Sequence, residues 1–268
     1  IRRDIIKMLV LAGSGHSGGP LGSSDIFTAL YFNGNMRYDR NNPDWEGRDR
    51  FVLSAGHMAP VMYAALANAG MYPKAEQATL RKYNTRLQGH PGRDMGLPGV
   101  ETSSGSLGQG ISIAVGMAMS DALLDHNDRR VYCLTGDGEL QEGQVWEAAM
   151  YASAKKVDNI IATIDQNKAQ IDGSTDEVLS LGDLKGKWEA FGWTVLEMNG
   201  NKMEEVVATL AKAKSLTGKG SPIMIMMNTQ MGNGVDFMMG SHKWHGVAPN
   251  AEQTQTALAQ LEETIGDY

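Results

Sequence analysis

One segment constrains the fold of this chain more than any other, because it holds a strand, a helix and a second strand in succession. The apolar run RRVYCLT (129–135) precedes the helical pattern LQEGQVWEAAMYASAKK (140–156), and the apolar run NIIATIDQN (159–167) follows. Two strands joined by a crossover helix form a βαβ unit, in which the strands lie parallel. The segment therefore predicts a parallel sheet with helices packed on it.

The rest of the 268-residue chain shows the same alternation of strands and helices. Residues 84–106 are rich in Gly and Pro and show no period, so we expect a long functional loop there. We predict an α/β fold with a doubly wound, mostly parallel sheet flanked by helices, in a single domain covering residues 1–268. Further strands are expected at 50–56, 194–200 and 222–229, and helices at 2–12, 22–33, 59–69, 74–83, 108–125, 183–191, 202–217 and from about 250 to Tyr268.

Composition and charge argue against several classes of function. The chain has 31 acidic and 24 basic residues, a net charge of −7, and lacks the basic stripe of a protein that binds nucleic acid. Cys133 is the single cysteine, which excludes a disulfide framework and a cysteine-rich zinc site and permits the cytoplasmic location that we expect. The longest apolar run, PIMIMM (222–227), has the length of a strand, so we expect no membrane span.

Asp137 and Asn167 each stand at the carboxyl end of a predicted strand of the βαβ unit. Because parallel strands end at the same edge of a sheet, both side chains should emerge together. Their oxygens and a nearby backbone carbonyl suit Mg²⁺, with Ca²⁺ or Mn²⁺ as alternatives, bound jointly with phosphate. Gly136 and Gly138 leave room for a diphosphate, and a helix that begins near Leu140 would direct its positive end at that group. Taken alone, GDG is more often a tight turn, but the Asn at the end of the next strand favours a functional site.

A second glycine motif, AGSGHSGGPLG (12–22), has the Gly-x-Gly-x-x-Gly spacing of a dinucleotide fingerprint. That fingerprint follows a strand and precedes an acidic residue by about 20 positions. Here a helical pattern precedes the motif, and residues 31–37 contain no acid. We therefore expect no dinucleotide site, and we infer that these glycines bend the chain so that His16 faces a ligand.

Several segments resemble one enzyme family, in order along about residues 10 to 250. GDG followed by Asn167 resembles the signature of proteins that bind thiamine diphosphate, and GDGELQEGQVWEA is similar to the form found in transketolases. Four more segments resemble transketolase segments: SGHSGGPLG, LSAGHMAPVMYAAL, PGVETSSGSLGQGISIAVGMA and WHGVAPN. The resemblance implies the thiamine diphosphate-binding fold of the domain that holds the diphosphate.

The resemblance also implies roles for individual residues. Asp137, Asn167 and the carbonyl of Ala169 would hold the metal on the diphosphate. Four histidines would act as catalytic groups near the diphosphate, the sugar hydroxyls or a developing oxyanion: His16, His57, His90 and His245. Besides the metal ligands, the implied cofactor-binding residues are His57, Gly105, Ser106, Leu107, Gly136, Gly138, Glu142 and His245.

Some residues have simpler interpretations or depart from the family pattern. Glu139 and Glu142 could be favourable acids in the first turn of a helix, although Glu142 resembles a residue that joins two cofactor sites across a subunit interface. We expect His242 at the surface. Ser106 stands where the family has Pro, and Ala169 stands where it usually has Ile or Val, which predicts a slightly roomier site.

The resemblance implies half of an enzyme. In the family, the Glu that activates the aminopyrimidine comes from a pyrimidine-binding domain, which we expect on a separate chain in a heterotetramer of two plus two. A terminal helix reaching Tyr268 favours a natural chain end over a truncated one. The implied reaction transfers a two-carbon ketol unit from a ketose, a sugar phosphate or similar, to an aldose. Phosphate, sulfonate and neutral head groups all remain open.

Three alternatives share part of the pattern. The α-subunit of a 2-oxo acid dehydrogenase shares the cofactor and GDG…N but lacks the LSAGH and GxLGQG segments. A synthase of the deoxyxylulose-phosphate type keeps its domains in one long chain. A non-catalytic relative would keep the fold as an interaction or regulatory subunit, and the intact Asp137, Asn167 and four histidines count against it.

Overall fold

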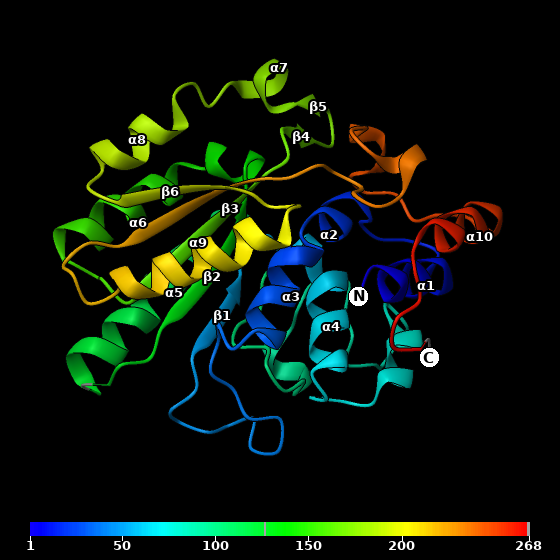
Figure 1. Ribbon diagram of the computed structural model, residues 1–268, viewed down its shortest axis with the longest axis horizontal. Helices are drawn as coiled ribbons and strands as arrows, with labels where there is room; N and C mark the ends of the chain where they lie inside the picture. The colour runs from blue at the N-terminus through cyan, green and yellow to red at the C-terminus, as the bar shows by residue number, and fades with distance from the viewer. Residues whose placement is uncertain (126, 267–268) are drawn as a thin grey trace.

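The computed structural model describes residues 1–125 and 127–266, and it contains a five-stranded parallel sheet (Figure 1). The order across the sheet is β1-β2-β3-β7-β6, and each neighbouring pair is parallel, which confirms the predicted sheet. The strands are β1 (Arg50–Leu53), β2 (Val131–Gly136), β3 (Ile160–Gln166), β6 (Thr194–Asn199) and β7 (Ile223–Asn228).

Alternate side chains along the strands enter two separate cores. In β1, Phe51 and Leu53 pack into one cluster, whereas Val52 packs into the other. In β2, Tyr132 and Cys133 divide in the same way. Side chains of a strand point alternately to opposite faces, so burial of both faces requires continuous apolar runs such as those seen in the sequence.

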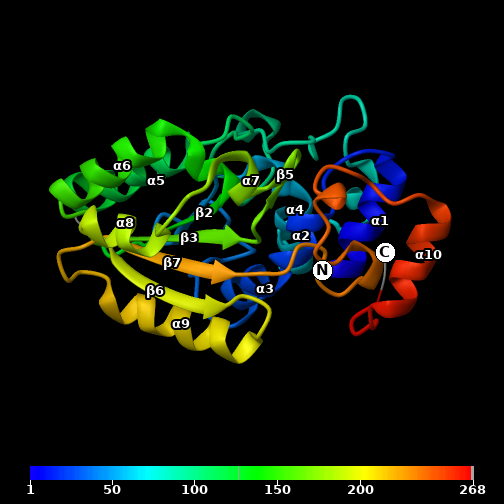
Figure 2. The same ribbon diagram turned by 90° about the horizontal axis from the view of Figure 1, so that it is seen from above.

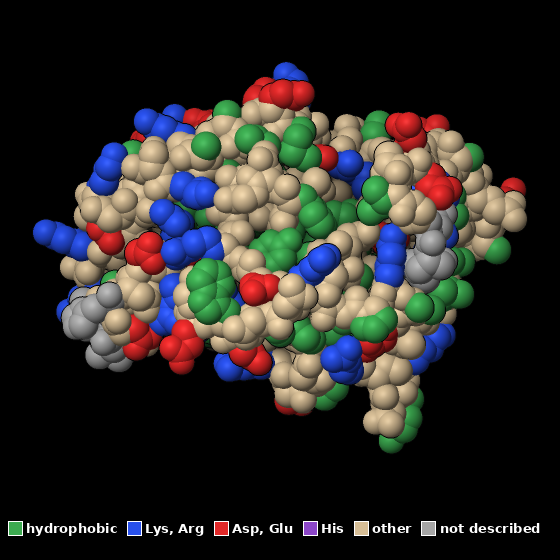
Figure 3. Space-filling view, turned by 60° about the horizontal axis from the view of Figure 1, so that its bottom comes forward, with side chains coloured by type: hydrophobic (Ala, Val, Ile, Leu, Met, Phe, Trp, Pro, Cys, Tyr) green, Lys and Arg blue, Asp and Glu red, His purple; other side chains and the backbone are tan. Residues whose placement is uncertain are grey.

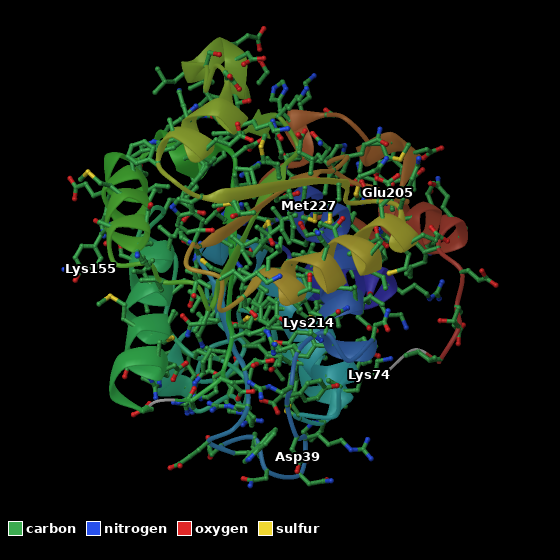
Figure 4. The ribbon with its side chains drawn as sticks, turned by 60° about the vertical axis from the view of Figure 1, so that its left-hand side comes forward. Asp39, Lys74, Lys155, Glu205, Lys214 and Met227 are labelled. Carbon is green, nitrogen blue, oxygen red and sulfur yellow. The ribbon has the colours of Figure 1, made fainter. Side chains whose placement is uncertain are left out.

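Helices cover both faces of the sheet (Figure 2). One layer holds α3 (Ser24–Phe32), α4 (Ala59–Asn68) and α9 (Met203–Leu216), and the other holds α5 (Gly110–Met119), α6 (Gly143–Ala154) and α8 (Leu184–Ala190). Figure 4 shows Met227 of β7 in the interior of the molecule, whereas Lys155 extends outward at the end of α6. The predicted doubly wound architecture is therefore confirmed.

Smaller elements gather near the carboxyl edge of the sheet. Helix α1 (Arg2–Ala12) packs against α4 and against α10 (Ala251–Gln260), and the short α2 (Gly18–Gly22) follows α1. An antiparallel pair, β4 (Ala169–Gln170) and β5 (Gly173–Ser174), leads into α7 (Thr175–Leu179). This pair of two-residue strands was not predicted, because two residues are too few to show a period.

Several helix boundaries differ from prediction, and two of them concern the predicted site and the end of the chain. The helix expected from Leu140 begins at Gly143, and residues 138–141 form a tighter 3₁₀ turn whose first N–H donates to the Asp137 carboxylate. The terminal helix ends at Gln260, whereas we expected it to reach Tyr268. The prediction is wrong for residues 261–266, and Tyr268 lies outside the described residues. Leu261 leaves the helical region with an extended backbone, and the polar residues that follow bury no apolar face.

The surface mixes charges of both signs. On the face shown in Figure 3, Lys and Arg side chains are interspersed with Asp and Glu side chains. Within residues 1–125 and 127–266, we find no helix with both the length and the apolar character needed to cross a bilayer.

Two glycines of α5 give a matched test of the packing. A Cβ added at Gly110 would lie 2.5 Å from the Ser54 Cα, whereas one added at the exposed Gly116 would meet nothing within 4 Å. We expect Gly110→Ala to lower the free energy of unfolding by about 1–3 kcal/mol through overpacking. Gly116→Ala should raise it by about 0.5–1 kcal/mol, because Ala is the better helix former. Urea denaturation measures both, and shifts of the same sign would contradict the packing described.

Candidate active site

The carboxyl ends of β2 and β3 bring Asp137 and Asn167 together, as the βαβ unit predicts. The buried Asp137 carboxylate accepts hydrogen bonds from the N–H groups of Gly138, at 2.8 Å, and Lys168, at 2.5 Å. The Asp137 N–H donates to the Asp165 carbonyl at 3.2 Å, and the Asn167 amide donates to the Asp165 carboxylate at 2.8 Å. The N–H of Gly138, one of the implied cofactor-binding residues, thus donates to Asp137 in this structure.

Asp165 is a buried carboxylate that no sequence motif indicates. Its side chain is 0% exposed and accepts hydrogen bonds from the Thr229 hydroxyl and the Asn167 amide. Burial raises the pKa of Asp165 to about 6. Burial, followed by the charge of Asp165, raises the pKa of Asp137 to about 7. Both carboxyl groups are desolvated and their charges repel each other, so a cation beside them would stabilise their ionised forms.

The oxygens at this edge fit a divalent cation. The Asn167 Oδ1 accepts a hydrogen bond from the Ala169 N–H at 3.0 Å, so both residues belong to one tight turn beside Asp137. Carboxylate, amide and carbonyl oxygens retain a second lone pair for a metal. The described residues contain no group of three or more His, Cys, Asp or Glu side chains suited to a metal ion. A cation here would therefore depend on amide, carbonyl and phosphate oxygens as well as Asp137.

Four loops bring the four predicted histidines into one cluster. The ring centroid of His16 lies 5.0 Å from that of His57, 5.6 Å from that of His245 and 6.3 Å from that of His90. The His57 and His245 centroids are 5.1 Å apart. His16 and His245 come from opposite ends of the chain, so only the tertiary fold makes the four histidines neighbours.

The glycine motif of residues 12–22 bends the chain at this cluster, as the sequence indicates. The Ser17 hydroxyl donates to the carbonyls of Trp244, at 3.1 Å, and Val247, at 2.8 Å, and so ties the first histidine loop to the last. A Cβ added at Gly18 would lie 2.4 Å from Met231 Cγ and 3.1 Å from the Trp244 oxygen. Close packing therefore explains this glycine without a bound dinucleotide.

The histidines are held in their neutral form. Burial lowers the pKa of His57 to about 3 and that of His16 to about 4, and the neighbouring histidines add to both shifts. Burial also lowers the pKa of His90 and of His245, the latter opposed by a hydrogen bond with the backbone of Ala169. Among the described residues, nothing hydrogen-bonds the buried Nδ1 of His16 or of His245. Neutral imidazoles offer one donor and one acceptor each, as a sugar hydroxyl requires.

The lowered pKa of His57 predicts a pH effect on stability. The folded-state pKa lies below the unfolded value near 6.5, so the unfolded chain takes up a proton on His57 first. The stability that neutral His57 allows is therefore complete above pH 6.5 and is lost as the pH falls from there toward 3. A His57→Gln variant lacks this loss. When the pH is lowered from 7.5 to 5, its free energy of unfolding should fall by about 1–2 kcal/mol less than that of the wild type. Urea denaturation of the cofactor-free proteins at both pH values measures the difference. His242→Gln, at an exposed histidine outside the cluster, should follow the wild type, and identical pH dependence in all three proteins would refute the burial argument.

The loop before α5 lies against the histidine cluster. Gly105 has φ 144°, a conformation that favours glycine, and a Cβ there would lie 3.3 Å from the His90 Cγ. Leu107 is 37% exposed. A cavity of about 410 Å³ adjoins the loop, lined by His90, Ser103, Ser104, Gly105, Ser106, Gln109 and Gly110. The predicted residues Gly105 and Ser106 are thus placed beside His90, and Leu107 follows them in the loop.

Glu139 and Glu142 differ in their surroundings. Glu139 is 2% exposed, and its carboxylate accepts hydrogen bonds from the Ser54 hydroxyl and from the N–H groups of Gly108 and Gly136. Glu139 lies in the first turn of the short 3₁₀ helix, as the simpler interpretation expects, but its burial and its distant partners were not predicted. Glu142 is exposed, and a Cβ added at Gly108 would lie 2.7 Å from its Cβ.

Comparison with known proteins gives a consistent match along the chain. Residues 1–263 match the family model described as transketolase, thiamine diphosphate binding domain. The chain is 41% identical, over 98% of its length and 92% of the relative, to an apulose-4-phosphate transketolase subunit from Phocaeicola vulgatus. It is 42% identical, over 98% of its length and 94% of the relative, to a 6-deoxy-6-sulfo-D-fructose transketolase subunit from Clostridium sp..

Longer relatives match over part of their length only. Human transketolase is 38% identical over 92% of this chain, which spans 38% of the human protein. Transketolase from Leishmania mexicana superposes with a TM-score of 0.87 at 34% identity, over 97% of this chain and 40% of the longer one. The chain thus spans about two fifths of the length of these solved or full-length relatives.

Proposed function

Because this chain belongs to the transketolase family, we propose that it is the diphosphate-binding subunit of a transketolase-type enzyme. The proposed reaction transfers a two-carbon ketol unit from a ketose, a sugar phosphate or similar, to an aldose. One observation carries the proposal: the Ala169 backbone, next to Asn167 in the proposed metal site, lies close enough to His245 of the histidine cluster to act on its pKa. A cofactor held at the strand ends and a sugar held by the histidines would therefore be neighbours.

The strand ends supply the proposed cofactor site. Thiamine diphosphate would supply the electron sink for carbon–carbon bond cleavage. Asp137, Asn167 and the Ala169 carbonyl would hold a divalent cation, Mg²⁺ or else Ca²⁺ or Mn²⁺, against the diphosphate. Gly136 and Gly138 present no side chain there, which leaves room for a phosphate to approach the backbone.

The histidines supply the proposed substrate site. His16 and His90 would bind sugar hydroxyls or a developing oxyanion, or carry a proton between them, since each neutral ring has one donor and one acceptor. His57 and His245 would face the diphosphate and the reacting end of the sugar. Near the aminopyrimidine we place Gly105, Ser106 and Leu107, and we assign Glu142 to the network that joins two cofactor sites.

A partner chain completes the proposed enzyme. The relatives named as transketolase subunits cover nearly the length of this chain, which supports a separate second subunit carrying the pyrimidine-binding domain and its Glu. We propose a heterotetramer of two plus two, with residues 1–268 of this chain as one domain. The single, buried Cys133 fits the cytoplasmic location that we propose.

The head group of the substrate is proposed from the names of two relatives. Two relatives are named for apulose 4-phosphate and 6-deoxy-6-sulfo-D-fructose, sugars that end in a phosphate and a sulfonate. These names support a sugar with an anionic end for this chain as well. A neutral sugar is the alternative, and a donor panel separates the three classes.

The proposal is tested with this chain and a candidate partner purified together. Native mass spectrometry should show two copies of each chain, and ketoses with phosphate, sulfonate or neutral ends should be compared as donors in the presence of thiamine diphosphate and Mg²⁺. We expect one anionic class to be preferred. A complex that binds thiamine diphosphate but uses no ketose would favour the non-catalytic alternative, and oxidative decarboxylation of a 2-oxo acid would favour the dehydrogenase alternative.

A further inference from the structure

Glu139 connects three segments that surround the proposed cofactor site. Its Oε1 accepts hydrogen bonds from the Ser54 hydroxyl, at the end of β1, and from the Gly108 N–H at 2.8 Å. Its Oε2 accepts one from the Gly136 N–H at 3.0 Å. The Ser54 side chain is fully buried, as Glu139 nearly is, so the bonds from Ser54 and Gly108 are shielded from water and that from Gly136 is partly shielded. One carboxylate thus joins two backbone segments and a strand end.

The loop on one side of Glu139 has little regular structure of its own. Residues 101–109 form no helix or strand, and Gly108 has φ 81°. Contacts at two glycines press this loop against the end of β1: a Cβ at Gly56 would lie 2.6 Å from the Gly105 nitrogen, and one at Gly110 would lie 2.5 Å from the Ser54 Cα. These contacts set the distance between the loop and the end of β1. The directional hydrogen bond from Gly108 to Glu139 sets the position of the loop along that strand end.

We propose that Glu139 is a positioning residue that holds the loop of residues 104–110 in register with the Gly136–Gly138 turn. The loop carries Gly105 and Leu107, placed near the aminopyrimidine, and the turn carries the metal ligand Asp137. Glu139 touches neither substrate nor cofactor and acts through these backbone segments. The consequence for the cofactor rests on the proposed function, whereas the clamp itself rests only on the hydrogen bonds of this chain.

The clamp predicts local changes in amide hydrogen exchange without any cofactor. In the wild type, the Gly108 amide should exchange more slowly than its loop neighbours, because it has a buried acceptor. Glu139→Gln keeps the side-chain shape but replaces one acceptor oxygen with a donor, so Gly108 or Gly136 must face an NH₂ group. Exchange should then accelerate by about tenfold or more at 104–110 and 134–139. The rest of the chain should keep its wild-type rates.

The assembled enzyme gives a second readout. In Glu139→Gln we expect the concentration of thiamine diphosphate needed for half-maximal activity to rise about tenfold or more, while the KM for the sugar stays within about threefold. A purely structural defect would reduce the number of active sites and leave both constants unchanged. Glu204→Gln, at an exposed carboxylate on α9, is the matched control and should behave as the wild type.

Several results would overturn the clamp. These are unchanged exchange in Glu139→Gln, acceleration spread evenly over the chain, or a wild-type Gly108 amide that exchanges as fast as its neighbours. The last measurement needs no variant, so it decides the matter even where Glu139→Gln does not fold. Failure of the wild type to bind thiamine diphosphate would instead reject the proposed function, because exchange is measured on the cofactor-free chain.

Discussion

An Asp137→Asn variant is expected to lose about a thousandfold or more of the ketol-transfer activity of the assembled enzyme. Asp137 is the one charged side chain in the proposed metal set, and two backbone N–H groups orient it, at 2.8 and 2.5 Å. An Asn keeps the shape but removes the charge that offsets the cation. The measurements are the transfer rate and the thermal shift produced by thiamine diphosphate with Mg²⁺.

The control for Asp137→Asn is Asp39→Asn. Figure 4 shows Asp39 in a loop at the far end of the molecule, and its carboxylate accepts one hydrogen bond from the Asn41 N–H at 2.8 Å. This variant should keep wild-type activity and the full thermal shift. An Asp137→Asn enzyme that retains both would reject the metal assignment, whereas loss in both variants would indicate damage to the fold.

A His16→Ala variant should lower kcat/KM for the sugar by about 100-fold to 1000-fold, with thiamine diphosphate affinity kept within about threefold. His16 lies at the centre of the cluster, 5.0–6.3 Å from the other three ring centroids. Its loss removes a neutral donor and acceptor without touching the strand ends that would hold the cofactor. Steady-state kinetics and calorimetric titration with the cofactor measure the two effects separately.

The separation between these two effects is the decisive part of the His16 prediction. A fall in cofactor affinity as large as the fall in kcat/KM would place His16 at the cofactor instead of the sugar. His242→Ala removes an exposed histidine outside the cluster and should leave both constants unchanged. Unchanged kinetics in His16→Ala would remove this histidine from the proposed substrate site.

The meeting of Asp137 and Asn167 at the strand ends could be predicted because it follows from local pattern. Asp137 and Asn167 close two buried strands of one βαβ unit, and parallel strands end at a common edge. The five-stranded sheet followed from the same alternation, and the resemblance to transketolases drawn from the motifs is confirmed by the family match. What the resemblance implied about the roles of individual residues stays a prediction.

The features that were missed depend on contacts between distant segments. Glu139 follows GDG and looks like an acid at the start of a helix, but Ser54 and Gly108 turn its carboxylate into the interior. Asp165 sits in an apolar run and takes its partner Thr229 from the neighbouring strand end. The periodicity of a single segment carries no information about partners in distant segments. For the same reason, the histidine cluster could be inferred only from resemblance.

The central claim is that this chain performs two-carbon transfer only with a partner that supplies the pyrimidine-binding domain. The most direct test uses a ketose labelled with ¹³C at C1 and C2, an unlabelled aldose, thiamine diphosphate and Mg²⁺. We expect the label in a new ketose only when both chains and both cofactors are present. Labelled product from this chain alone, or from both chains without thiamine diphosphate, would contradict the account.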